Sequence, residues 1–148
     1  MSIKSFIDAA KILYEQNFYN ESLCLICIAI DATASKFYPD KKGNERYKLF
    51  LKDRFRTLSE VGFPGISADN ICIKLNTVIE NLKPDKNGYV NIEQIIYHLI
   101  RCGLVHQCDL EQSIEFTEET IIGNWNTDKF YIPKNIIWGL IAIVEDCC

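Results

Sequence analysis

Hydrophobic side chains recur every three or four positions along most of the chain, which is the pattern of helices that bury one face. In residues 3–16 this pattern predicts a helix of about four turns. A second helix should run from Ser22 to Tyr38 and end there, because a residue before proline disfavours the helical backbone region. This helix is apolar on nearly every side, so we expect it at the centre of a bundle. Its charged residue Asp31 should be paired, because burying an unpaired charge is costly.

The middle of the chain has a less regular pattern. A third helix is predicted from Asn44 to Leu58, followed by a loop over residues 59–70, which contain two glycines and a proline. Residues 68–82 favour a fourth helix, although their β-branched side chains leave a partly extended segment as an alternative.

The last third of the chain combines a long helix, two short strands and a final helix. Asn91 should cap the long helix. Residues 113–116 and 129–132 have β-strand character with turn residues between them, so we expect a small β-hairpin there. Pro133 fits the first turn of a final helix over residues 134–144.

These elements predict a mainly α fold, a helical bundle of five to six helices with a small β-hairpin before the C-terminal helix. With 148 residues, 48% of them hydrophobic and 24% charged, the chain should form a single domain over residues 1–148. No apolar run approaches the ~18 residues of a membrane span. The N-terminus has the pattern of an amphipathic helix rather than a signal peptide. We therefore expect a cytoplasmic protein with no membrane partner and with its seven cysteines reduced.

Positive charge is concentrated in one stretch of an acidic chain. Residues 36–56 hold eight basic and three acidic side chains, a net charge of +5 in a protein whose net charge is −4. A basic patch on an acidic body can steer a polyanion to one place, so the face from Arg46 to Arg56, with Lys48, is a candidate RNA guide. The alternative is an ordinary solvated helix face.

The sequence predicts no metal site and no cofactor. Residues 83–93 superficially follow the spacing of a calcium-binding loop around Gly88. Lys83 and Gln94, however, stand where two acidic ligands belong. Asn87 and Gly88 are better interpreted as a turn.

The strongest chemical signal lies in residues 97–108, which contain both histidines of the chain, His98 and His106, together with Arg101. A histidine can transfer protons in both directions near neutral pH, and an arginine can hold phosphate oxygens with its planar fork. Together they suffice for metal-free RNA cleavage. His106 would remove the ribose 2′-OH proton, and Arg101 would stabilise the charge that builds up around phosphorus.

The spacing of the two residues raises a geometric question. On an ideal helix, five residues rotate a side chain by about 500°, which leaves Arg101 and His106 roughly 140° apart. Either the helix unwinds near Gly103, or the two residues act on different sides. A dimer that brings two copies of the motif together around a twofold axis would also resolve the question.

The sequence Arg101-Cys-Gly-Leu-Val-His106 near the end of a late helix in a small bundle resembles the HEPN superfamily (higher eukaryote and prokaryote nucleotide-binding domains). The resemblance in pattern covers roughly residues 3–108, including Tyr97 and the long second helix with Asp31. It implies a helical domain that is often dimeric, with a cleft where paired motifs meet. Many members resemble metal-independent endoribonucleases of toxin–antitoxin or phage-defence systems, and others are non-catalytic. Cys102 stands where a polar residue is common, so both alternatives stay open.

On this resemblance the expected function is that of a HEPN-like, metal-independent endoribonuclease of a toxin or phage-defence type, acting as a homodimer. Arg101 and His106 would be catalytic. Substrate-binding roles would fall to four further residues: Asp31, Arg46, Lys48 and His98. Either Asp31 or Glu45 would orient Arg101, and His98 would otherwise be a hydrogen-bonded structural group. Expected partners are RNA and an antitoxin or nucleotidyltransferase. The alternative function is that of a non-catalytic dimerisation, nucleotide-binding or protein-binding module.

Overall fold

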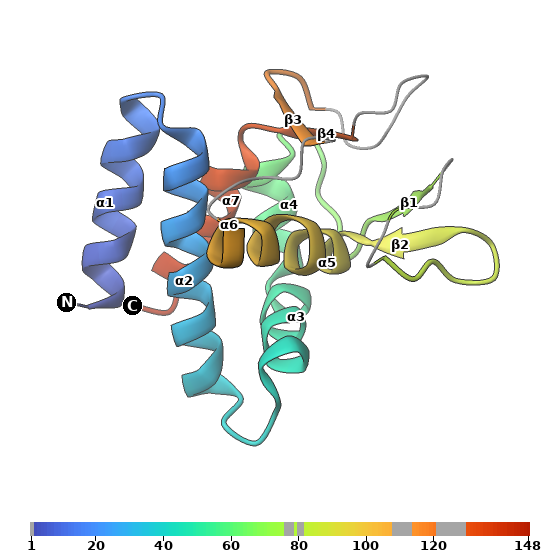
Figure 1. Cartoon of the computed structure of the whole chain (residues 1–148), viewed down its shortest axis with the longest axis horizontal. Coiled ribbons are helices and arrows are strands. Elements are labelled where there is room, and N and C mark those ends of the chain that lie inside the picture. The colour runs from blue at the N-terminus through green and yellow to red at the C-terminus, as the bar shows by residue number, and fades with distance from the viewer. Residues whose placement is uncertain (1, 76–78, 80–81, 108–113, 121–129) are drawn as a thin grey trace.

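A computed structural model of the chain describes residues 2–75, 79, 82–107, 114–120 and 130–148. Two long antiparallel helices, α1 (Ile3–Glu15) and α2 (Tyr19–Phe37), lie side by side at its N-terminal end (Figure 1). Ser2 begins α1 with a capping box that it shares with Ser5. Within α2, the buried Ser22 hydroxyl donates a 2.6 Å hydrogen bond to the carbonyl of Ala10, which ties the two helices together.

The α2 helix occupies the central position that its all-round apolar pattern predicts. It packs against α1, α3 (Gly43–Asp53), α6 (Cys102–Gln107) and α7 (Ile136–Glu145). Residues Leu23, Ile26 and Ile30 are fully buried in it. This packing places Asp31, the next residue along α2, beside the helix that carries the Arg101 motif.

The predicted third helix is present but divided. Arg54 separates α3 from α4 (Phe55–Gly62), so residues 59–62, which were expected in a loop, continue the helix instead. The Arg54 guanidinium stacks over the rings of Phe37 and Phe50, at 4.6 and 4.1 Å from their centres, and donates to the Tyr38 hydroxyl at 3.2 Å. These contacts with the end of α2 hold the chain at the break between α3 and α4.

A short antiparallel pair, β1 (Cys72–Lys74) and β2 (Tyr89–Asn91), stands where the fourth helix was favoured. The helical prediction is wrong for residues 72–74, and the extended alternative is right. The strands pair Ile73 with Val90, so that backbone hydrogen bonds to β2 outweigh the weak helical pattern. Residues 68–71, 75, 79 and 82 are not helical either, and residues 76–78 and 80–81 lie outside the described residues.

Two further strands, β3 (Ile114–Thr117) and β4 (Phe130–Pro133), lie close to the expected positions of the second pair. They run parallel, so the two strands do not form the hairpin predicted between them. Ser113 and Lys129, which that prediction included, lie outside the described residues. Pro133 ends β4 instead of starting the last helix, and α7 begins three residues later at Ile136.

The fold class predicted from the sequence is confirmed: the described chain is a helical bundle with a small antiparallel ribbon, β1–β2, before the C-terminal helix. Residues 92–107 form one continuous helical segment, which we call the site helix. It comprises α5 (Ile92–Ile95), a π-helical part η1 (Ile96–Arg101) and α6. With this segment taken as one helix, the described residues contain six helices. None of the described helices is long and apolar enough to span a bilayer.

Candidate functional site

The site helix changes its winding just before the motif. Residues 96–101 are π-helical, and the amide of Cys102 donates to the carbonyl of Tyr97, five residues earlier. A π-turn contains one residue more than an α-turn, so it changes the direction of the side chains that follow, and such turns occur frequently at functional sites. The expected weakening at Gly103 is wrong, since Gly103 lies within α6. The irregularity falls one turn earlier.

Arg101 is anchored by the carboxylate of Asp31. Its Nε and Nη2 atoms donate to the same oxygen, Oδ2, at 2.9 and 2.8 Å. The two side chains are 17% and 26% exposed, so the ion pair is sheltered but not sealed from solvent. Burial acts against the charged form, but the hydrogen bonds and charge of Asp31 prevail, and the pKa of Arg101 is raised. The expected pairing of Asp31 is confirmed. Glu45, the other candidate, pairs with Lys41.

The remaining terminal nitrogen of Arg101 faces His106. Nη1 lies 3.4 Å from Nε2 of the imidazole and 3.8 Å from the sulfur of Cys102. His106 is exposed. The ideal-helix estimate of 140° describes the directions of the Cβ atoms, whereas the guanidinium sits at the end of a long side chain that reaches around the helix. The two motif side chains therefore meet within one chain.

Tyr97 forms the other side of the site. The Arg101 guanidinium lies 5.3 Å and the Lys48 ammonium 5.6 Å from the centre of its ring, within the range of cation–π attraction. The ring also meets those of His98 and Tyr47 edge-on, at centroid distances of 5.1 and 5.2 Å. Tyr97 thus links the motif to α3. Tyr97 was not among the site residues predicted from the sequence, although its spacing of four from Arg101 was a usable signal.

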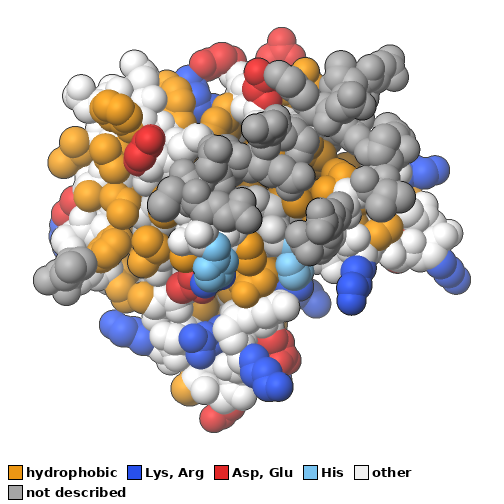
Figure 2. Space-filling view, in the orientation of Figure 1, with side chains coloured by type: hydrophobic (Ala, Val, Ile, Leu, Met, Phe, Trp, Pro, Cys, Tyr) orange, Lys and Arg blue, Asp and Glu red, His pale blue; other side chains and the backbone are white. Residues whose placement is uncertain are grey.

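His98 and Lys48 both lie beside the Tyr97 ring. Burial lowers the pKa of half-buried His98, and the positive charges of Lys48 and Lys83 lower it further. Burial also lowers the pKa of Lys48, against the influence of Cys102 and Glu93. Figure 2 shows the two histidines of the chain on one face of the molecule, with basic side chains beside them. No hydrogen bond holds His98 among the residues that the structure describes, so its predicted structural alternative is not supported there.

Arg46, the remaining predicted substrate-binding residue, forms no hydrogen bond or ion pair with this group among the described residues. It is half-buried, and its Nε is buried without a hydrogen-bond partner in the described part of the chain. Nothing recorded for the described residues joins it to Arg101 or His106. The structure therefore brings together Asp31, Arg101 and His106, and places Lys48 and His98 next to them, without Arg46.

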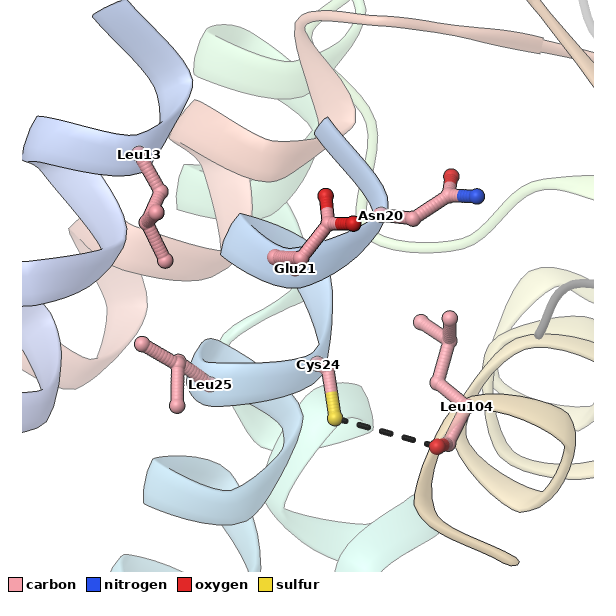
Figure 3. Close-up of a pocket in the computed structure, with 6 residues that line it drawn as sticks. All are labelled: Leu13, Asn20, Glu21, Cys24, Leu25 and Leu104. Carbon is pink, nitrogen blue, oxygen red and sulfur yellow. Dashed lines mark hydrogen bonds between the residues drawn. The ribbon is translucent and has the colours of Figure 1, made fainter. Parts of the chain in front are cut away.

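A separate apolar pocket of about 260 Å³ lies between α1, α2 and α6 (Figure 3). Leu13, Leu25 and Leu104 face it, and the Cys24 thiol donates to the Leu104 carbonyl at 3.8 Å. None of the residues that line it belongs to the Arg101–His106 group. Within the described ranges, no three side chains of His, Cys, Asp or Glu gather as metal ligands.

The described residues thus define a small, mainly helical protein with an acid-anchored arginine beside an exposed histidine on its surface. The chain belongs to the Rv1289 family, whose family model matches residues 2–145. No curated protein and no solved structure matches it. The description of the family states no activity, so the chemistry of the site is argued from its geometry.

Proposed function

We propose that this protein is a HEPN-like, metal-independent endoribonuclease whose catalytic pair is Arg101 and His106. The observation that carries the proposal is the 3.4 Å approach of Arg101 Nη1 to His106 Nε2, with the other side of the guanidinium fixed by Asp31. A fixed cation and an exposed proton carrier at one place are the groups that cleavage of a phosphodiester requires. Both groups are accessible enough to meet a substrate from outside.

The chemistry uses the 2′-hydroxyl of the RNA itself. His106 takes the proton of the 2′-OH, and the 2′-oxygen attacks the adjacent phosphorus. The bond from phosphorus to the 5′-oxygen of the next nucleotide breaks, and His106 returns the proton to that oxygen. The products are a 2′,3′-cyclic phosphate and a 5′-hydroxyl end. Arg101 Nη1 donates to a non-bridging oxygen as negative charge develops, while Asp31 prevents the guanidinium from turning away.

The same resemblance supports a cellular setting. A HEPN-like nuclease of this kind would act in the cytoplasm as a homodimer, in a toxin–antitoxin or phage-defence system. Its activity would be restrained by an antitoxin or by a nucleotidyltransferase. Sedimentation of the purified protein measures the dimer directly, and a pull-down with the product of the adjacent gene tests for the restraining partner.

The proposal is tested by incubating the protein with end-labelled RNA in excess EDTA. We expect cleavage with cyclic-phosphate and 5′-hydroxyl ends, and no cleavage of DNA of the same sequence, since DNA lacks the nucleophile. His106→Gln and Arg101→Ala should each lower the rate by at least about a hundredfold, the range of a lost general base or charge stabiliser. Lys4→Ala, which removes an exposed ion pair on α1, is the control and should cleave normally.

A second candidate function is RNA or nucleotide binding without cleavage. Two observations favour this candidate. Two of the three guanidinium nitrogens of Arg101 already donate to Asp31, so one remains for a substrate. Beside that third nitrogen, Cys102 supplies only a thiol. It predicts that folded wild-type protein leaves RNA intact but binds it more tightly than Arg101→Ala does. Intact RNA together with equal binding by the two proteins would contradict both functions.

A further inference from the structure

A second group of basic side chains lies around Tyr97, the residue that the Arg101 guanidinium also contacts. The ammonium of Lys48, from α3, lies 5.6 Å from the Tyr97 ring centre, and the imidazole of His98 meets that ring at 5.1 Å. The Arg101 guanidinium lies over the same ring at 5.3 Å. Both groups therefore contact the same half-buried tyrosine, which places them close together.

This second group lacks counter-ions. Lys4, Lys11, Arg56 and Lys134 each form an ion pair with an acid within 4 Å. Neither Lys48, Lys83 nor His98 does so in the described part of the chain. The positive charges of Lys48 and the exposed Lys83 both lower the pKa of His98, so the imidazole beside the Tyr97 ring lies in the field of two cations. Such an arrangement is unfavourable in the free protein and becomes favourable when an anion lies among the three groups.

The carboxylate that acts on Lys48 is buried. It belongs to Glu93, from α5, whose Oε2 atom has no hydrogen-bond partner among the described residues. Burial raises the pKa of Glu93, which weakens its negative charge. Only 7% of the residue is exposed, so it does not occupy the surface position that an anion would take. Cys102 is the remaining titratable neighbour of Lys48.

We propose that Lys48, Lys83 and His98 form a second phosphate-binding site, which holds a neighbouring phosphodiester of the RNA strand that the catalytic pair cleaves. The identity of this anion as RNA rests on the proposed function, whereas the binding of a phosphate does not. The spacing implies that the substrate is a strand with at least one phosphate besides the scissile one. A dinucleotide, which has a single phosphodiester, leaves this second site empty.

Protonation of His98 provides the direct readout. In the free protein its pKa lies below the ordinary value of 6.5, so the imidazole is neutral at neutral pH. A phosphate at the site favours the protonated form, so binding should take up a proton. Affinity should therefore rise as the pH falls below the pKa of His98 in the complex, and level off below its pKa in the free protein. At higher pH the site should bind through the two lysines alone.

The experiment follows the two histidine C–H signals by NMR through a pH titration of the intact protein, assigned with His98→Gln and His106→Gln. The probe is a 2′-O-methyl trinucleotide, which carries two phosphodiesters and cannot be cleaved. We expect it to raise the pKa of His98 by about one unit, a tenfold change in the protonation equilibrium. Lys48→Met should abolish the rise. Lys4→Met, on α1, is the matched control and should retain it.

Cleavage provides a second, independent readout. For wild-type protein, kcat/KM should be about tenfold higher for a trinucleotide than for a dinucleotide, in the range of one lost phosphate contact. Lys48→Met should lower kcat/KM for the trinucleotide more than for the dinucleotide and so remove this preference, whereas Lys4→Met should keep it. If the pKa of His98 is the same with and without the trinucleotide, the second site is overturned, even where His106-dependent cleavage is present. Conversely, a His98 response without cleavage would support the site and contradict the nuclease. A response to inorganic phosphate but not to the trinucleotide would overturn the assignment to RNA.

Discussion

Asp31 determines what Arg101 can do. The carboxylate receives both Nε and Nη2 through one oxygen, which fixes the plane of the guanidinium and leaves Nη1 directed at His106. Geometric fixation of this kind contributes to catalysis because a misplaced charge stabilises the transition state poorly. In the proposed reaction Asp31 would thus be a positioning residue, and its effect should appear in turnover more than in substrate binding.

Asp31→Asn should separate this role from a merely structural one. The amide keeps the shape but loses the charge, so we expect kcat to fall at least about tenfold with little change in KM. The free energy of unfolding should fall by about 1–3 kcal/mol, the range for a lost hydrogen bond to a charged group. Urea unfolding and RNA-cleavage kinetics measure the two effects.

The control for this variant is Asp8→Asn, which removes an exposed ion pair with Lys4. Exposed pairs contribute little, so its urea unfolding curve should match that of the wild type. Normal kcat in Asp31→Asn would show that Arg101 does not need its anchor and would remove Asp31 from the mechanism.

At the scale of elements, the close contact of α4 with α7 holds the bundle together behind the site helix. Gly62 and Gly139 face one another there. A Cβ atom added at Gly139 would lie 2.9 Å from the Gly62 backbone and from the Leu58 carbonyl. Because all these neighbours are backbone atoms, they cannot move aside without separating the helices.

Gly139→Ala should therefore destabilise the protein by about 1–3 kcal/mol, the usual cost of overpacking. Gly43→Ala is the control, because a Cβ at Gly43 meets no atom within 4 Å. That variant, in the first turn of α3, should be neutral or slightly stabilising. Thermal unfolding compares the two proteins. Equal midpoints for Gly139→Ala and the wild type would mean that α4 and α7 lie further apart than described.

Long elements could be predicted from the sequence better than short ones, because a long element repeats its hydrophobic pattern several times. α1 and α2 run for 13 and 19 residues, long enough for helical periodicity to dominate. β1 has three residues and depends on pairing with β2, a partner that no local pattern identifies. The parallel direction of β3 and β4 likewise depends on the path between them.

The site was predicted in part for the same reason. Arg101, His106 and the paired Asp31 could be selected because their residue types and their setting in the sequence suggest their chemistry. The π-helical turn over residues 96–101 could not be predicted, since six residues are too few to reveal a changed period. Tyr97 was missed because its importance comes from contact with Lys48, which is distant in the sequence.

At the scale of the whole molecule, the basic stretch is less basic than its composition suggests. Of its eight cations, Arg54 is half-buried over the rings of Phe37 and Phe50, Arg56 pairs with Asp69, and Lys41 pairs with Glu45. The remainder of the chain is acidic, since the net charge is −4. A polyanion should therefore be attracted to the cations without partners, around Lys48, and repelled elsewhere.

This charge distribution predicts how RNA binding depends on salt. The affinity for an uncleavable 2′-O-methyl RNA should fall with rising salt, and each phosphate contact contributes about −0.7 to the slope of log K against log salt. Lys48→Met should reduce the slope by about this amount. Arg56→Met should reduce it less, because Asp69 already neutralises that cation at 2.8 Å. Fluorescence anisotropy at several salt concentrations measures all three slopes. If Arg56→Met changes the slope as much as Lys48→Met does, RNA is attracted by the whole basic stretch, and Lys48 has no special place in guiding it to the catalytic pair.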